Sequence, residues 1–166
     1  MNLSYIKERV DKQIKSYGGY WRPLSMVLRL IEEIGELSKA INIKYGDKRS
    51  KNESEDGNVE KELADVLYTA VALSNANNIS LNSKTINTNE KKEEIDPLDM
   101  LDKLIEYAWY IYAQLKKNYD KKQLTKYLNK IIKECVIIAN TLDIALEKSF
   151  IKKIGEDEET KLKFYS

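Results

Sequence analysis

The sequence predicts an all-α protein that folds as one domain over residues 1–166. Apolar residues recur every three or four positions along almost every long segment, and the alternation of apolar and polar residues that marks strands is scarce. At 166 residues the chain has the usual length of a single domain. A chain of this size buries roughly 70% of its unfolded surface, so it needs no disulfide to hold a core.

The periodicity places several helices, and polar segments connect them. Asp96-Pro97 marks one start, because aspartate caps free amide groups and proline suits the first turn. Asp120 with Gln123 marks another start in the same way. Two segments rich in Lys, Asn, Ser and Glu, 46–57 and 80–95, are expected to be mobile loops. The helices are expected at about 3–17, 24–44, 58–78, 97–118 and 121–149, and the charged tail is expected to dock through Leu162, Phe164 and Tyr165.

An internal repeat predicts how these helices pair. The segment from Pro23 to Glu32 resembles the segment from Pro97 to Glu106 at a constant offset of 74, and 61–81 resembles 126–146 at an offset of 65. Chance likeness between amphipathic helices is the alternative, but the shared proline starts and matched Asn-x-x-x-Ile-x-Leu ends favour duplication. Repeat 1 covers about 23–82 and repeat 2 about 97–149. We therefore expect a four-helix bundle built from two helical hairpins, with an N-terminal helix added.

Composition excludes several kinds of chemistry. The chain has no histidine, so a Ser-His-Asp triad, a histidine base and a histidine-ligated zinc site are ruled out. Its glycines fit neither the G-x-x-x-x-G-K-[ST] phosphate loop nor G-x-G-x-x-G. With 28 Lys+Arg and 27 Asp+Glu, the net charge of +1 gives no electrostatic case for nucleic-acid or membrane binding. The single cysteine and the lack of a long apolar run lead us to expect a cytoplasmic protein.

Carboxylates are the remaining chemistry, and they gather on two helices. Glu33 and Glu36 lie three residues apart on 24–44, as do Glu62 and Asp65 on 58–78. A solvated charged face is the ordinary interpretation of one such pair. However, the 58–78 helix is apolar nearly all round, which is typical of a buried helix. We therefore expect these acids to point into the protein.

Buried acids need a cation, and oxygen ligands favour particular ions. Arg29 and Lys61 are near in sequence but balance four acids incompletely. All-oxygen ligation selects Mg²⁺, with Mn²⁺ as an alternative, and Mg²⁺ commonly binds a substrate phosphate as well. In the second repeat the positions of the four acids hold Tyr107, Tyr110, Tyr127 and Lys130, which predicts one repeat that holds metal and one that packs beside it.

The run Glu32-Glu33-Ile34-Gly35-Glu36, followed after 25 residues by Glu62-Leu63-Ala64-Asp65, resembles the MazG-like superfamily of all-α nucleoside triphosphate pyrophosphohydrolases. The resemblance covers about residues 17–82. A tandem arrangement with one degenerate repeat is similar to the dimeric dUTPase branch, whereas most MazG proteins build the bundle from two chains. The resemblance therefore leaves a homodimer open.

The resemblance implies that Glu33, Glu36, Glu62 and Asp65 ligate Mg²⁺, and that Glu32 supports them or orients the attacking water. It implies hydrolysis of a nucleoside triphosphate between the α- and β-phosphates, which gives a monophosphate and pyrophosphate and cleans the nucleotide pool. For the substrate, Tyr20 and Trp21 are candidate stacking surfaces, with aromatic packing as the alternative, and Lys61 and Asn75 are further candidate contacts, Asn75 with a structural role as the alternative. Other interpretations are a dUTP/dCTP-selective or phosphoribosyl-ATP pyrophosphatase, and a non-enzymatic helical binding module with an acidic face.

Overall fold

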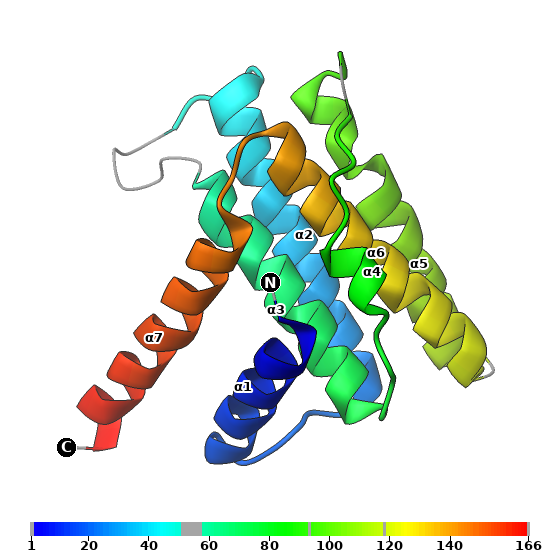
Figure 1. Ribbon diagram of the computed structural model, residues 1–166, viewed down its shortest axis with the longest axis vertical. Coiled ribbons are helices and arrows are strands. Elements are labelled where there is room, and N and C mark those ends of the chain that lie inside the picture. Colours follow the sequence, from blue (N-terminus) through cyan, green and yellow to red (C-terminus); the bar gives the residue numbers. More distant parts are fainter. Residues whose placement is uncertain (1, 51–57, 93, 118, 166) are drawn as a thin grey trace.

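The computed structural model describes residues 2–50, 58–92, 94–117 and 119–165, with side chains to residue 155. Within these ranges the chain is all-α, as predicted, and contains no strand (Figure 1). No helix in the described part is long and apolar enough to cross a membrane. The predicted docking of the tail side chains lies outside the described residues. The elements are α1 Leu3–Ser16, α2 Pro23–Tyr45, α3 Val59–Ala76, α4 Ser83–Ile86, the 3₁₀ helix η2 Pro97–Leu101, α5 Asp102–Lys117, α6 Lys121–Thr141 and α7 Leu146–Tyr165.

Side-chain caps start most of these helices. The Asp96 carboxylate accepts a hydrogen bond from the amide of Leu98 at 2.9 Å, and Asp120 accepts from the amides of Lys122 and Gln123. Both predicted starts are therefore confirmed. Each cap satisfies amides that have no partner inside the helix, which is why aspartate is favoured there.

The predicted last helix, 121–149, is wrong as a single element. α6 ends at Thr141, and α7 begins at Leu146 on a new axis. Asp143 stops α6 because its φ of 53° is left-handed, and the amide of Ile144 then turns back to the carbonyl of Ala139 at 2.8 Å. The α3 helix also ends earlier than predicted and in the same way.

The ends of α3 and α6 share one geometry at the offset of 65 residues. Asn78 has a φ of 51°, and the amide of Ile79 bonds the carbonyl of Ser74 at 2.9 Å. Asn75 and Asn140 each donate a side-chain hydrogen bond to a backbone carbonyl of another segment. The structure also differs from prediction in the 80–95 segment, which contains the short helix α4, and at residue 97, where a 3₁₀ turn precedes α5.

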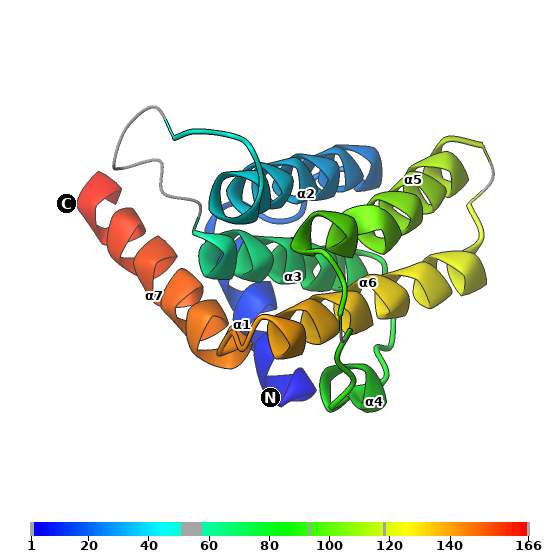
Figure 2. The same ribbon diagram turned by 90° about the horizontal axis from the view of Figure 1, so that it is seen from above.

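The long helices pack in two layers. α2 packs against α3 and α5, and α6 packs against the same two helices. Figure 2 shows α2 and α5 in one layer and α3 and α6 in the other. Their facing side chains form the buried core, which includes Leu30, Leu67, Leu104 and Ile131. The all-α class is confirmed, whereas a specific four-helix bundle stays a prediction.

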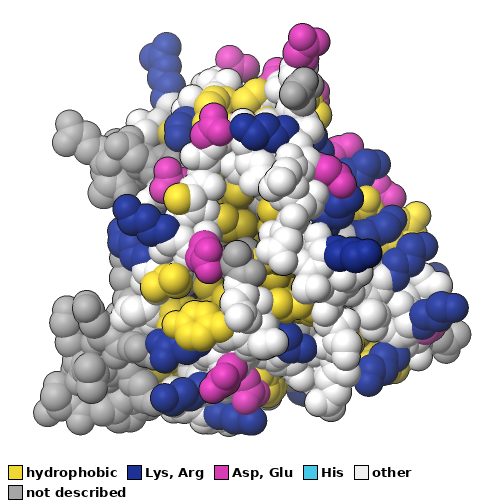
Figure 3. Space-filling view, in the orientation of Figure 1, with side chains coloured by type: hydrophobic (Ala, Val, Ile, Leu, Met, Phe, Trp, Pro, Cys, Tyr) yellow, Lys and Arg dark blue, Asp and Glu magenta, His cyan; other side chains and the backbone are white. Residues whose placement is uncertain are grey.

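Two further helices cover α3. Both α1 and α7 contact it, and α7 is held by Phe150, which is fully buried, and by Ile154. On the face seen in Figure 3, hydrophobic side chains line a central hollow, and charged side chains surround it. A pocket lies where α4, α6 and α7 meet, lined by residues that include Val136, Leu146 and Lys148.

Candidate metal centre

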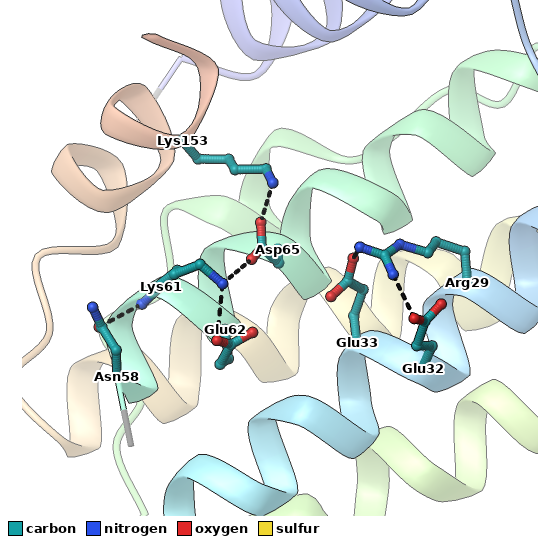
Figure 4. A network of polar contacts seen from close by, with 8 residues as sticks. All are labelled: Arg29, Glu32, Glu33, Asn58, Lys61, Glu62, Asp65 and Lys153. Carbon is teal, nitrogen blue, oxygen red and sulfur yellow. Dashed lines mark hydrogen bonds and ion pairs between the residues drawn. The ribbon is translucent and has the colours of Figure 1, made fainter. Parts of the chain in front are cut away.

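Three carboxylates from α2 and α3 converge where these helices pack (Figure 4). One oxygen from each of Glu33, Glu62 and Asp65 lies within 4.8 Å of the others. Glu33 is placed there because it is next to Ile34 on the buried side of α2, and Asp65 because α3 is buried along most of its length. The predicted convergence therefore holds for three of the four acids.

Burial differs among the predicted acids. Glu33 is 2% exposed and Asp65 is 3% exposed, while Glu62 is half-buried. The expectation that Glu36 is buried is wrong, because α2 turns this side chain toward solvent, although it still lies close enough to Glu33 to affect its pKa. Glu32 is exposed as well and pairs with Arg29 at 2.8 Å.

Three basic side chains contact the acids. Arg29 lies 2.5 Å from Glu33. Lys61 lies 2.9 Å from Glu62 and 3.2 Å from Asp65, so its ammonium is held by the acids of its own helix. Lys153 reaches Asp65 Oδ1 from α7 at 2.8 Å. Lys153 is not among the predicted site residues, because a single helix over 121–149 does not bring α7 against α3.

The basic side chains do not satisfy every acid. Glu33 Oε2, Glu62 Oε2 and Asp65 Oδ1 are buried without a hydrogen-bond donor among the residues that the structure describes, although Lys153 forms an ion pair with Asp65 Oδ1. The pKa of Glu33 is raised to about 7, mainly because the side chain is buried; Arg29 opposes this rise, and the charges of Asp65 and Glu36 add to it. The pKa of Lys61 is raised despite its burial, because Glu62 and Asp65 favour its charged form.

These residues fit a hard divalent cation. All the available ligand atoms are carboxylate oxygens, the ligands that Mg²⁺ prefers. Each of the three acids has one buried oxygen without a hydrogen-bond donor among the described residues. Oxygens on opposite sides of one Mg²⁺ ion lie about 4 Å apart. The observed 4.8 Å limit therefore needs only a small approach of the side chains to share one ion.

An aromatic pocket of about 260 Å³ opens beside the acids. Its lining includes Glu33 and Arg29 of α2 and Lys153 of α7, together with Thr69 and Ala72, which lie on the same side of α3 as Asp65. The aromatic residues of the pocket come from the end of α1, the following turn and α3. They are Tyr17, Tyr20, Trp21 and Tyr68.

The four predicted substrate contacts fall into two groups. Tyr20 and Trp21 line the pocket; the hydroxyl of Tyr20 donates to Asp11 at 2.7 Å, and Trp21 is 65% exposed. Lys61 and Asn75 do not line it. The amide of Asn75 donates to the carbonyl of Lys7 at 2.9 Å and so ties α3 to α1, which is a structural role.

The four positions that the repeat aligns with the acids also lie together. The rings of Tyr110 and Tyr127 stack with centroids 4.8 Å apart, and Tyr107 lies 5.9 Å from Tyr127. The ammonium of Lys130 lies 4.7 Å from the centroid of Tyr107 and 5.5 Å from that of Tyr127. The faces of both rings attract this ammonium, so the lysine and the tyrosines stabilise one another.

An all-α protein with a buried carboxylate cluster between two helices is a candidate metal-dependent hydrolase. Comparison with known proteins supports this class: the MazG nucleotide pyrophosphohydrolase domain matches residues 22–98. The chain is also 43% identical over 77 residues to the uncharacterized protein YpjD of Bacillus subtilis (strain 168), an alignment that covers 46% of this chain and 69% of YpjD. The chain therefore belongs to the MazG nucleotide pyrophosphohydrolase family. No solved structure matches it significantly.

The family match divides the site. It contains the three clustered acids together with Arg29 and Lys61, which all lie on α2 and α3. Lys153 and the aromatic residues at positions 17, 20 and 21 lie outside it.

Proposed function

We propose that this protein hydrolyses a nucleoside triphosphate between the α- and β-phosphates in a Mg²⁺-dependent reaction, releasing a nucleoside monophosphate and pyrophosphate. The observation that carries the proposal is the convergence of Glu33, Glu62 and Asp65 inside a domain of the pyrophosphohydrolase family. Removal of unwanted nucleotides from the pool is the role that this chemistry suits.

In this proposal Glu33, Glu62 and Asp65 hold the ion, and Glu36 joins them by swinging in from the exposed edge. A bound divalent cation would neutralise phosphate charge and lower the pKa of a bound water molecule. Since the chain has no histidine to act as a general base, such a water suits hydrolysis near pH 7. Arg29 orients Glu33 through their 2.5 Å contact. Glu32 holds the other side of the same guanidinium, so its role is to position Arg29.

The aromatic pocket supports a proposed position for the base. Its aromatic walls suit a flat heterocycle, and its lining also includes Glu33. We assign Tyr20 and Trp21 to the base, Tyr20 being fixed by Asp11 and Trp21 presenting an exposed ring. Candidate substrates include the standard nucleoside triphosphates, dUTP or dCTP alone, and phosphoribosyl-ATP.

A non-enzymatic binding module is less well supported. That interpretation requires acids that are separate and exposed to a basic partner. Glu33 and Asp65 are instead almost completely buried, and their oxygens lie within 4.8 Å of each other and of Glu62.

We also propose that the two hairpins arose by duplication and that only the first retains a metal site. The matched helix ends at Asn78 and Asp143 support this, since both use a left-handed residue at the same offset. The tyrosine and lysine cluster supports it too, because at the position that the repeat aligns with Asp65 the second hairpin has the positive charge of Lys130.

Purified protein incubated with Mg²⁺ and a panel of nucleoside triphosphates tests the activity. We expect pyrophosphate from at least one substrate, loss of release in EDTA, and loss of at least 100-fold in rate for Asp65→Asn, since a variant without the ion loses several kcal/mol of transition-state stabilisation. Glu60→Gln is the matched control, because Glu60 lies on the same helix but is exposed. Full activity of Asp65→Asn, or none in the native protein with any substrate and either Mg²⁺ or Mn²⁺, would contradict the proposal.

A further inference from the structure

Lys153 is brought to the acid cluster by a helix outside the matched family domain. α7 begins at Leu146, well beyond residue 98. Phe150 and Ile154 bury themselves on either side of Lys153 along the helix, and the ring of Phe150 lies 6.4 Å from that of Tyr68 on α3. The anchored helix therefore holds Lys153 over one particular part of α3.

Lys153 stands at the junction of two features. Its ammonium contacts Asp65 Oδ1 at 2.8 Å, and it lies 5.9 Å from the ring centroid of Tyr68, which lines the aromatic pocket. Among the described residues that line this pocket, Arg29 and Lys153 are the basic ones. A nucleotide with its base in the pocket and its phosphates at the acids therefore passes Lys153.

The three acids differ in how the basic side chains contact them. Asp65 has an ammonium group at each oxygen: Lys61 donates a hydrogen bond to Oδ2, whereas Lys153 forms an ion pair with Oδ1 that lacks hydrogen-bond geometry. Glu33 Oε2 and Glu62 Oε2 are likewise buried without a hydrogen-bond donor in the described part of the protein. Arg29 is held by two carboxylates, those of Glu32 and Glu33. Lys153 has the flexible four-carbon stem of lysine and a side chain that is 21% exposed. Lys61 has the same stem but contacts two acids of its own helix and does not line the pocket, so Lys153 is the lysine placed to reach a phosphate there.

We propose that Lys153 is a phosphate-binding residue that α7 adds to the family site. Without metal it pairs with Asp65; with metal and substrate it turns from Asp65 to the phosphate chain. This inference rests on the proposed function. It gives Lys153 two opposite effects, because its ammonium competes with the metal for Asp65 and attracts the substrate.

Lys153→Met tests both effects in the full chain. We expect the affinity for Mg²⁺ alone to rise several-fold, because Asp65 loses a competing cation. We expect the affinity for inorganic triphosphate in the presence of Mg²⁺ to fall about tenfold, the value of one hydrogen bond to a charged group. Inorganic triphosphate is the probe because it does not depend on the choice of base. In turnover the loss should appear mainly as a higher KM.

Two variants separate this role from a structural one. Lys153→Arg keeps the charge and should restore triphosphate binding to within about threefold of the native protein. Lys148→Met is the matched control, since Lys148 is exposed on the same helix and lines the other pocket. If Lys153 only stabilised α7, replacing it would lower the affinity for Mg²⁺ and the affinity for triphosphate together.

The results distinguish the two proposals. Unchanged triphosphate binding in Lys153→Met, or weaker Mg²⁺ binding, would overturn the inference while hydrolysis by the native protein still upholds the proposed function. Triphosphate binding that depends on Lys153 in a protein that hydrolyses no nucleotide would support the phosphate role and overturn the proposed activity.

Discussion

Replacing Glu33 with Gln should stabilise the metal-free protein at pH 8. Glu33 is 2% exposed and faces Asp65 and Glu36, and its pKa of about 7 compares with an ordinary value of 4.5. Between these values the folded protein holds a proton that the unfolded chain has released, so its free energy of unfolding falls as the pH rises. Gln has the shape of the protonated acid but does not titrate, so the variant keeps this free energy of unfolding as the pH rises.

The size of the effect follows from the two pKa values. The interval between 4.5 and about 7 corresponds to about 3 kcal/mol. Water around the exposed Glu36 and the partly exposed Arg29 screens part of it, so we expect a gain of about 1–2 kcal/mol at pH 8. For a chain of this length this raises the Tm by about 3–6 °C.

Urea and thermal unfolding in EDTA measure this gain. Glu33→Gln and the native protein should have equal stability near pH 4.5 and should diverge up to about pH 8. Added Mg²⁺ should reverse the order, because it stabilises the native site by about 2.7 kcal/mol at 100 times its Kd and has little to bind in the variant. Glu32→Gln, at an exposed position, should change stability by about 0.5 kcal/mol or less. A variant less stable than the native protein at pH 8 in EDTA would show that attraction to Arg29 outweighs burial and repulsion.

Three further predictions concern the fold. Phe150→Ala should cost about 3–5 kcal/mol in urea unfolding, because Phe150 is fully buried where α7 meets α3; a cost below about 1 kcal/mol would mean that α7 is not docked. Asp120→Ala should cost about 1 kcal/mol through loss of the α6 cap, and an unchanged Tm would contradict the capping geometry. Cys135 is completely buried, which raises the pKa of its thiol, so a thiol reagent at pH 8 should label it only after denaturation; rapid labelling of the native protein would contradict its burial.

The all-α class and most of the acid cluster could be predicted from the sequence. Apolar spacing marks the buried side of α2 and nearly all of α3, and this alone places Glu33 and Asp65 in the interior. The exposure of Glu36 could not be read in this way, because it lies at the margin of the apolar side, where a small rotation of α2 decides its burial.

The break between α6 and α7 shows a second limit. Apolar periodicity continues through 142–145, and only the left-handed backbone of Asp143 ends the helix, a conformation that a sequence rich in asparagine and aspartate does not single out. A prediction without this break does not bring Lys153 close to α3. Its contact with Asp65 joins residues 88 positions apart, and no local pattern encodes such a distance.

The division of the site between the matched domain and its flanks has a consequence for how selectivity can change. The acids sit on two helices that the core holds firmly, whereas three of the four aromatic pocket residues come from the end of α1 and the turn before α2, and Lys153 comes from the last helix. Under the proposed function, exchanging those flanking segments changes which base is accepted and leaves the acid cluster in place. For the same reason, a fragment trimmed to residues 22–98 would retain the acids but lose Tyr17, Tyr20, Trp21 and Lys153 from the pocket lining.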